Sequence, residues 1–265
     1  MEGQSHSFEM QQFPSPSSGL KYKVLTLSPQ FPLSEQEGDL AQSTMAYGIR
    51  STFKGRKKAI SLGLLPFKNP NQPRTANIIT YPDHQIWQLE TQAEVEQFLK
   101  QAFPQLPLEK IISPEEIARF AASDGGKFPI PQYCSGLYQI CGKPQDNQGT
   151  AVILLGDAAH CFPPDIGQGV NSALEDIYIF QETLAETQDN LSQALPRYQN
   201  LRQPDIKALI RLVQISYPWQ YNQAPLRKKL WSLNFFLRLL LSRIFPFLFN
   251  PHSFLLIQNY ELSYY

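Results

Sequence analysis

The sequence predicts an α+β fold in which a mostly antiparallel sheet precedes a strand–turn–helix motif and a helical C-terminal region. Three observations support this prediction. Five segments between residues 21 and 89 have strand-like composition and are joined by polar loops without long helical stretches, which favours antiparallel pairing. The apolar run Ala151–Leu155 leads through a glycine-rich turn into an apolar pattern of helical period. From residue 191 onward, apolar residues again recur at helical spacing.

The pattern divides the chain into four parts. Residues 1–19 form a polar leader rich in Ser, Gln and Pro, which is expected to be irregular. Residues 20–142 hold the sheet and two short helices, residues 143–190 hold the strand–turn–helix motif, and residues 191–265 form a helical cap. The expected strands before the motif are Lys21–Leu27, Thr44–Phe53, Ala59–Leu65, Ala76–Tyr81, Ile86–Leu89 and Cys134–Cys141.

Local signals set the expected helix boundaries. Thr91 followed three residues later by Glu94 is a capping-box pattern, and Ser113-Pro114 marks the start of a second short helix. Pro196 and Pro204 are expected to divide the helix that begins near residue 191, because proline lacks the amide that an interior turn needs.

Composition and charge exclude several classes of protein. The chain has 42% hydrophobic and 17% charged residues, which suits a globular fold, and zero net charge, which gives no general attraction to nucleic acid. Its three cysteines lack metal-ligand spacing, so no metal site and no disulfide framework are expected, and the predicted location is cytoplasmic. Residues 191–259 contain nine Lys and Arg but one acid, Asp205. That excess is either a solvated face or a surface for anionic lipid or an acidic substrate.

The strand–turn–helix motif predicts a ligand site. Ala151–Leu155 is expected to be a strand buried on both faces, ending at Gly156-Asp157. Pro163-Pro164 and Gly167-Gln168-Gly169 precede the helix, whose first amides have no partner within it and therefore suit an anionic or electron-rich ligand. The apolar face of this helix comprises Val170, Ala173, Leu174, Ile177, Phe180 and Leu184. The alternative is an ordinary strand–loop–helix in which Asp157 caps a local turn.

The segment GDAAHCFPPDIGQGVNSALED resembles the second flavin-binding motif of the FAD-dependent aromatic hydroxylases, the class A flavoprotein monooxygenases, and most of all the kynurenine 3-monooxygenase group within that family. The matching positions are Gly156, Asp157, Ala158, Ala159, His160, Pro164, Gly167, Gln168, Gly169, Asn171, Glu175 and Asp176. A weaker resemblance runs through most of the remaining chain. It implies the C-terminal portion of a two-domain FAD/NAD(P)-binding hydroxylase fold.

The resemblance also implies roles for residues of the motif. Asp157, after Gly156, would accept hydrogen bonds from the flavin ribityl chain, and Pro163-Pro164 would lie beside the isoalloxazine ring. The amides of Gly167, Gln168, Gly169, Val170 and Asn171 would face the pyrimidine end of the ring. Negative charge collects there in reduced flavin, and a helix N-terminus stabilises it. No protein residue is expected to act as a catalytic nucleophile, and His160 is expected to orient the loop.

The implied activity is hydroxylation of an aromatic small molecule with FAD as cofactor, NAD(P)H as reductant and O₂ as co-substrate. Ser216 aligns with a substrate-contacting asparagine of the family, and Tyr217 lies beside it. These two residues are the candidate substrate-binding positions. Because asparagine is replaced by serine, kynurenine itself is not established as the substrate.

One expected part of such an enzyme has no match. The chain contains no G-x-G-x-x-G, the sequence that holds the ADP half of FAD. We therefore expect an upstream polypeptide to supply this unit, and we expect its loss to expose an edge of the Ala151–Leu155 strand and an apolar face. The alternative is a non-catalytic remnant or interaction protein that cannot hold FAD.

The segment Leu230–Phe249 is dense in Leu, Ile, Phe and Trp but carries Arg238, Arg243 and Pro246, which argue against a transmembrane span. It is expected either to cap the substrate cavity, as helices at this point do in relatives of the family, or to lie in a membrane surface.

Overall fold

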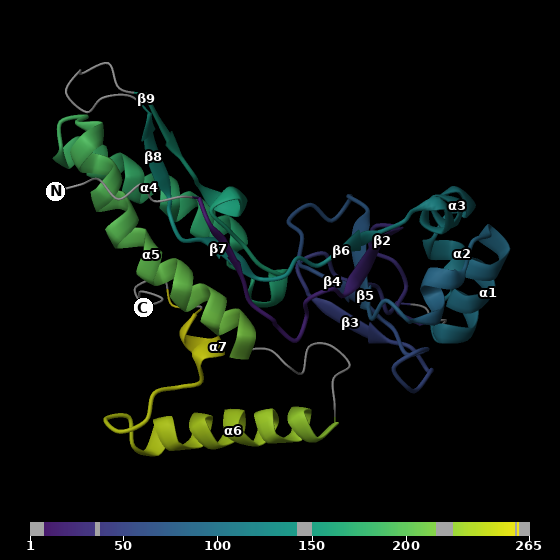
Figure 1. The fold of residues 1–265 in the computed structure, drawn as a ribbon. Coiled ribbons are helices and arrows are strands. Elements are labelled where there is room, and N and C mark those ends of the chain that lie inside the picture. Colours follow the sequence, from purple (N-terminus) through teal and green to yellow (C-terminus); the bar gives the residue numbers. More distant parts are fainter. Residues whose placement is uncertain (1–7, 35–37, 142–149, 216–224, 258, 260–265) are drawn as a thin grey trace. The chain divides into compact units, whose positions relative to one another are not determined.

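The computed structural model describes residues 8–34, 38–141, 150–215, 225–257 and 259. The chain forms two compact units (Figure 1). One comprises residues 19–127, and the other comprises residues 1–18 together with residues 128–265. The sequence placed the end of the sheet domain at residue 142, whereas the compact unit ends at Lys127.

The unit of residues 19–127 is built on a five-stranded sheet in the order β3-β4-β5-β2-β6, in which all paired strands are antiparallel. Its strands are β2 (Lys21–Leu27), β3 (Tyr47–Arg50), β4 (Ser61–Leu64), β5 (Arg74–Thr80) and β6 (Gly126–Lys127). The longest ladder joins β2 to β5, from Lys21 opposite Thr80 to Leu27 opposite Arg74. The predicted antiparallel sheet is therefore confirmed, although β3 and β4 are shorter than the segments that the sequence indicated.

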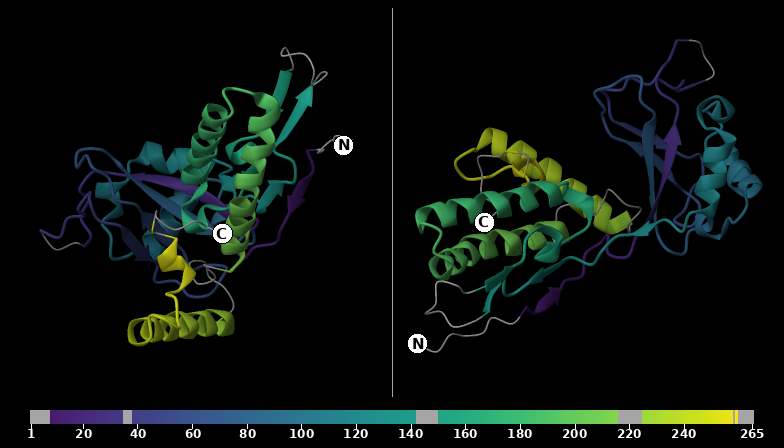
Figure 2. Two further views of the ribbon diagram at one scale, coloured as in Figure 1. Left: turned by 90° about the vertical axis from the view of Figure 1, so that its left-hand side faces the viewer. Right: turned by 90° about the horizontal axis from the view of Figure 1, so that it is seen from above.

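Three helices cover one face of this sheet (Figure 2). They are α1 (Gln92–Ala102), α2 (Leu108–Ile111) and α3 (Pro114–Ala122). Alternate residues of the strands, such as Leu25 and Ile78, are fully buried and share one apolar cluster with Val95, Leu99 and Phe120 of the helices. The period of two along the strands and the period near 3.6 along the helices thus direct their apolar side chains into a common core.

Two helix starts follow the local chemistry that the sequence indicated. The Thr91 hydroxyl accepts a hydrogen bond from the Glu94 amide at 3.3 Å, and the Glu94 carboxylate accepts one from the Thr91 amide at 3.0 Å. The Ser113 hydroxyl likewise accepts from the Glu116 amide, with Pro114 in the first turn of α3. Each cap satisfies amides that the helix cannot pair internally.

The expected strand Ile86–Leu89 is wrong. Residues Gln85–Gln88 form the 3₁₀ helix η1, whose start is capped by the His84 ring, because Nδ1 accepts a hydrogen bond from the Ile86 amide at 3.1 Å. Ile86 is fully buried in the core of this unit, so its apolar character reflects burial in a turn rather than a sheet position.

The second unit contains two small antiparallel sheets and four α-helices among its described residues. The sheets are β1 (Met10–Gln12) with β7 (Gln132–Cys134) and β10 (His160–Cys161), and the hairpin of β8 (Tyr138–Cys141) with β9 (Thr150–Ile153). The helices are α4 (Gly169–Glu186), α5 (Leu191–Ile215), α6 (Pro225–Ile244) and α7 (Ser253–Leu256). Part of the leader, β1, thus belongs to a sheet, and the expected strand Cys134–Cys141 is two strands separated by a turn.

Two further expectations for this unit are wrong. The strand β9 is not buried on both faces: it pairs only with β8 among the described residues, and the Val152 side chain is 45% exposed. The helix α5 runs continuously through Pro196 and Pro204. Burial of side chains along α5, including Leu195, Tyr198 and Ile206, offsets the cost of these prolines.

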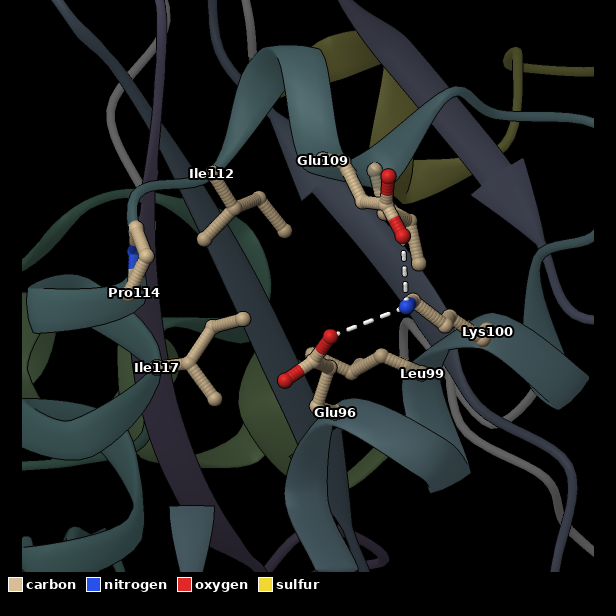
Figure 3. A pocket seen from close by; sticks show the side chains of 8 residues that line it. Glu96, Leu99, Lys100, Glu109, Ile112, Pro114 and Ile117 are labelled. Carbon is tan, nitrogen blue, oxygen red and sulfur yellow. Dashed lines mark hydrogen bonds and ion pairs between the residues drawn. The ribbon is translucent and has the colours of Figure 1, made fainter. Parts of the chain in front are cut away.

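A small crevice in the unit of residues 19–127 opens between α1 and α3 (Figure 3). Its volume is about 90 Å³, and apolar side chains including Leu99, Ile112 and Ile117 line it. At its rim, the Lys100 ammonium lies 2.9 Å from the Glu96 carboxylate and 2.6 Å from that of Glu109. The crevice contains no residue of the strand–turn–helix motif.

We expect Thr91→Ala to lower the free energy of unfolding by about 1 kcal/mol, because the Glu94 amide loses its acceptor. Thr91→Ser keeps the hydroxyl and should leave most of the stability in place. Urea unfolding followed by circular dichroism would measure both changes. Equal effects of the two substitutions would contradict the assignment of the cap.

Candidate cofactor site

The site begins where β9 ends. Gly156 opens the 3₁₀ helix η2 (Gly156–Ala158) with φ of 56°, a left-handed conformation that glycine adopts without strain. A Cβ atom at this position would lie 3.2 Å from the Cβ of Ala173 on α4, so a side chain would also crowd the helix. The next residue, Asp157, is exposed and therefore free to meet a ligand from solvent.

The turn before α4 has the second set of predicted residues. Pro163 is buried, and Pro164 starts the 3₁₀ helix η3 (Pro164–Ile166), which ends at Gly167 with φ of 66°. Gln168 is buried and occupies the N-cap position of α4, and its side-chain oxygen accepts a hydrogen bond from the side-chain amide Nδ2 of Asn171 at 3.0 Å. The local sequence therefore fixes the direction in which the helix leaves the turn.

The start of α4 is open and rich in hydrogen-bond donors. A Cβ atom built on Gly167 or Gly169 would have no atom within 4 Å apart from its own chain neighbours. Within the described chain, the backbone amides of Gly169, Val170 and Asn171 have no hydrogen-bond acceptor. Such first-turn amides and the positive end of the helix dipole suit a negatively charged or electron-rich group. These residues therefore fit the pyrimidine end of a flavin, as the resemblance implies.

A buried carboxylate connects the elements that form the site through hydrogen bonds. Asp176 of α4 accepts hydrogen bonds from the Gly156 amide at 2.8 Å, from His160 Nε2 at 2.7 Å and from Arg202 Nε at 2.8 Å. The side chains of Asp176, His160 and Arg202 are each at most 1% exposed. The carboxylate thus connects η2, β10, α4 and α5 at one point.

Arg202 of α5 extends this network. Its guanidinium lies 3.0 Å from the Glu175 carboxylate and 3.3 Å from that of Asp205, and it also donates to the Ser172 hydroxyl at 3.1 Å. Burial of a charge is costly unless it is paired and hydrogen-bonded, and Arg202 meets this condition on several sides. The network is therefore able to keep a full positive charge inside the unit.

The pKa directions agree with a charged network. Burial alone would raise the pKa of Asp176, but the hydrogen bonds and charge of His160, the Gly156 amide and the Arg202 charge outweigh it and lower the pKa. Glu175 differs, because burial and the neighbouring carboxylates raise its pKa despite Arg202. Asp176 is thus the anchor that stays ionised.

The helix α4 buries its polar side and exposes much of its apolar side. Ser172, Asp176 and Thr183 are its buried residues. Of the predicted apolar face, Val170 is 74% exposed, and Leu174 and Ile177 are also exposed. Exposed contiguous apolar surfaces of this kind are typical of interaction sites.

The structure brings most of the predicted residues into one region of the second unit, because η2, η3 and the start of α4 are joined through the network of Asp176 and through the short chain between them. Ser216 and Tyr217 lie outside the described residues. Arg202 and Ser172 were not singled out from the sequence. The spacing could have identified Arg202 as buried, because it lies four residues after Tyr198 and four before Ile206, on the buried face of α5.

Comparison with known proteins supports the flavin assignment. Residues 145–213 match the family model described as FAD binding domain. Kynurenine 3-monooxygenase of Yarrowia lipolytica is 36% identical over 83 residues, which are 31% of this chain and 18% of that protein. Violacein synthase of Chromobacterium violaceum is 41% identical over 66 residues, which are 25% of this chain and 15% of that protein. The resemblance to FAD-dependent monooxygenases is therefore confirmed, over less than a fifth of the length of these relatives.

A solved structure shows the fold. The tetrameric form of 2-methyl-3-hydroxypyridine-5-carboxylic acid oxygenase is similar with a TM-score of 0.52 and 18% sequence identity. The match covers 78% of this chain and 48% of the oxygenase. The predicted fold class, a mostly antiparallel sheet with a strand–turn–helix motif and C-terminal helices, is thereby confirmed.

We expect Asp176→Asn to lower the free energy of unfolding by roughly 3 kcal/mol at neutral pH, because Arg202 loses its buried carboxylate. Asp83→Asn is the matched control: it breaks the exposed pair with Arg56, and such pairs contribute about 0–1 kcal/mol. Chemical unfolding of the three proteins gives the comparison.

The pH dependence follows from the lowered pKa of Asp176. A carboxyl group whose folded pKa is depressed adds stability above its unfolded pKa and loses it as pH falls through the folded pKa. The stability difference between the wild type and Asp176→Asn should therefore shrink in acid. A difference that stays constant as the pH falls would show that the charge of Asp176 is not what stabilises the site.

Proposed function

We propose that this chain forms the flavin-ring side of an FAD-dependent monooxygenase that hydroxylates an aromatic small molecule with NAD(P)H and O₂. The observation that carries the proposal is the arrangement around α4. An exposed carboxylate lies on η2, the amides at the helix start have no acceptor among the described residues, and open space lies in front of Gly167 and Gly169. The match of residues 145–213 to an FAD binding domain supports it.

Each group of the site has a defined task in this proposal. Asp157 accepts hydrogen bonds from hydroxyl groups of the ribityl chain. The amides of Gly169, Val170 and Asn171 donate to the pyrimidine edge of the ring and stabilise the negative charge of the reduced state. Bound flavin supplies the redox and oxygen chemistry, which protein side chains lack. The task of the chain is thus to bind, orient and stabilise rather than to attack the substrate.

Substrate recognition is assigned by resemblance. Ser216 and Tyr217 are the proposed contacts to the aromatic substrate, and the antiparallel sheet of residues 19–127 is the proposed substrate-side element. The named relatives include a kynurenine 3-monooxygenase and a violacein synthase. An aromatic substrate of this general kind is therefore proposed, without a commitment to kynurenine.

The phosphate end of the cofactor requires a further component. The chain has no G-x-G-x-x-G for the ADP half of FAD. We propose that an upstream polypeptide supplies this dinucleotide-binding unit and covers the exposed apolar residues Val152, Val170, Leu174 and Ile177. Burial of this surface would give the association its driving force.

A second candidate function is a non-catalytic interaction protein that keeps the fold but holds no flavin. The absence of a phosphate-binding loop in the sequence favours it. The two candidates differ in a property of the purified chain, which is whether a free flavin binds at the start of α4.

We expect the chain alone to bind riboflavin and FAD with similar affinity, because the residues present contact only the ring and the ribityl chain. Asp157→Ala should weaken both by about tenfold, since it removes an ionised hydrogen-bond acceptor. Asp39→Ala, an exposed aspartate of the other unit, is the matched control and should bind as the wild type does. Quenching of flavin fluorescence during titration measures all of these affinities.

A protein that leaves flavin fluorescence unchanged at millimolar FAD would support the interaction protein. Oxidation of NAD(P)H by the flavin-loaded chain, coupled to consumption of O₂, would support the enzyme.

A further inference from the structure

The helix α6, whose course is drawn in Figure 1, has exposed apolar side chains along its whole length. None of its residues is buried. Six of its exposed large apolar side chains recur alternately four and three residues apart, so they lie on one side of the helix, and exposed Phe236 lies at the edge of that side. The stripe consists of Leu226, Leu230, Leu233, Leu237, Leu240 and Ile244. It continues beyond the helix into Phe247 and Leu248, which are 99% and 79% exposed.

The opposite side of α6 contacts the chain's own C-terminal segment. The Trp231 ring centroid lies 5.0 Å from that of His252, and the Phe235 centroid lies 5.4 Å from it. Trp231 and Phe235 stack on each other at 5.2 Å and are half-buried. Within the described residues, the helix therefore packs through its aromatic side, and the leucine stripe is the side that stays exposed.

Positive charge flanks the leucine stripe. At about 100° per residue, Arg227 and Arg238 project to one side of it, and Lys229 and Arg243 project to the other. No acidic residue occurs from residue 206 to residue 259. Within the described chain, none of these four cations forms an ion pair with a carboxylate. The stripe is thus apolar in the middle and cationic on both edges.

This charge pattern favours an anionic lipid surface over a second copy of α6 as the partner of the leucine stripe. Two helices that pair through a leucine stripe stabilise the contact by opposite charges beside it, whereas a second copy of α6 would bring cations against cations. No helix in the described chain is long and apolar enough to cross a bilayer. A helix with an apolar face and basic edges instead suits the boundary between the head groups and acyl chains of an anionic membrane.

We propose that α6 and the Phe245–Phe249 segment bind in the plane of an anionic lipid surface. The leucine stripe and Phe247 enter the acyl boundary, the flanking arginines and lysines meet anionic head groups, and the Trp231 side stays against the protein. This surface lies outside the proposed cofactor site, so it does not depend on flavin binding.

Flotation of the full chain with vesicles tests the proposal. Vesicles of phosphatidylcholine that contain phosphatidylglycerol should carry the protein, and vesicles of phosphatidylcholine alone should not. Leu233→Glu with Leu237→Glu should weaken vesicle binding by at least about tenfold, because apolar burial is lost. Arg238→Glu with Arg243→Glu should weaken it by a similar factor and reduce its sensitivity to salt.

Matched controls separate a specific surface from a change in net charge. Leu40→Glu with Leu65→Glu replaces two exposed leucines of the other unit, and Lys54→Glu with Lys57→Glu reverses two exposed cations there. Both controls should float like the wild type. Because all the substituted residues are exposed, circular dichroism should be unchanged in every variant.

Three results would overturn the proposal. One is equal flotation with neutral and anionic vesicles, and another is equal flotation of wild type and the α6 variants. The third is a dimer in sedimentation analysis that Leu233→Glu with Leu237→Glu dissociates, together with no vesicle binding, since it would assign the stripe to a second copy of this chain.

Discussion

The Asp176 carboxylate is the interaction on which the candidate site depends. It accepts hydrogen bonds from the Gly156 amide, from His160 and from Arg202, which belong to three elements other than its own helix α4. Inside a unit of low polarity, three donors directed at one carboxylate are strong enough to keep it ionised. The left-handed turn at Gly156 is thereby fixed to the side of α4. The exposed Asp157 then has a defined position relative to the start of that helix.

The same network explains the unusual orientation of α4. A surface helix ordinarily buries its apolar stripe and exposes its polar side. In α4 the buried residues are Ser172, Asp176 and Thr183, whereas Val170 and Leu174 are exposed. The ion pairs with Arg202 hold the polar side inward, so the apolar side remains available for another component. The contacts that stabilise the site and the surface proposed to bind a partner therefore lie on opposite sides of one helix.

Features of the structure that depend on neighbouring residues in the sequence could be predicted, and features that depend on packing against distant residues could not. The capping box at Thr91 could be predicted from the residues, because its pattern carries its own hydrogen bonds. The segment from Gly156 to Asp176 indicated a ligand at a helix start, and only its resemblance to a known family identified that ligand as flavin. Period alone identified the apolar side of α4 but could not say whether it faces protein or solvent. The continuity of α5 through Pro204 and the role of Arg202 both depend on burial against distant residues, which a single sequence does not reveal.

The two exposed apolar surfaces of the second unit differ in charge, and this difference separates their occupants. The helix α4 contains Glu182 and Glu186 with no Lys or Arg, so anionic lipid would be repelled from it. The helix α6 contains only basic charges, so the same lipid would be attracted. Apolar area alone would allow either surface to bind either occupant. Charge therefore supports the two proposals, a polypeptide at α4 and an anionic lipid surface at α6, and the two proposed occupants would use different surfaces of the unit.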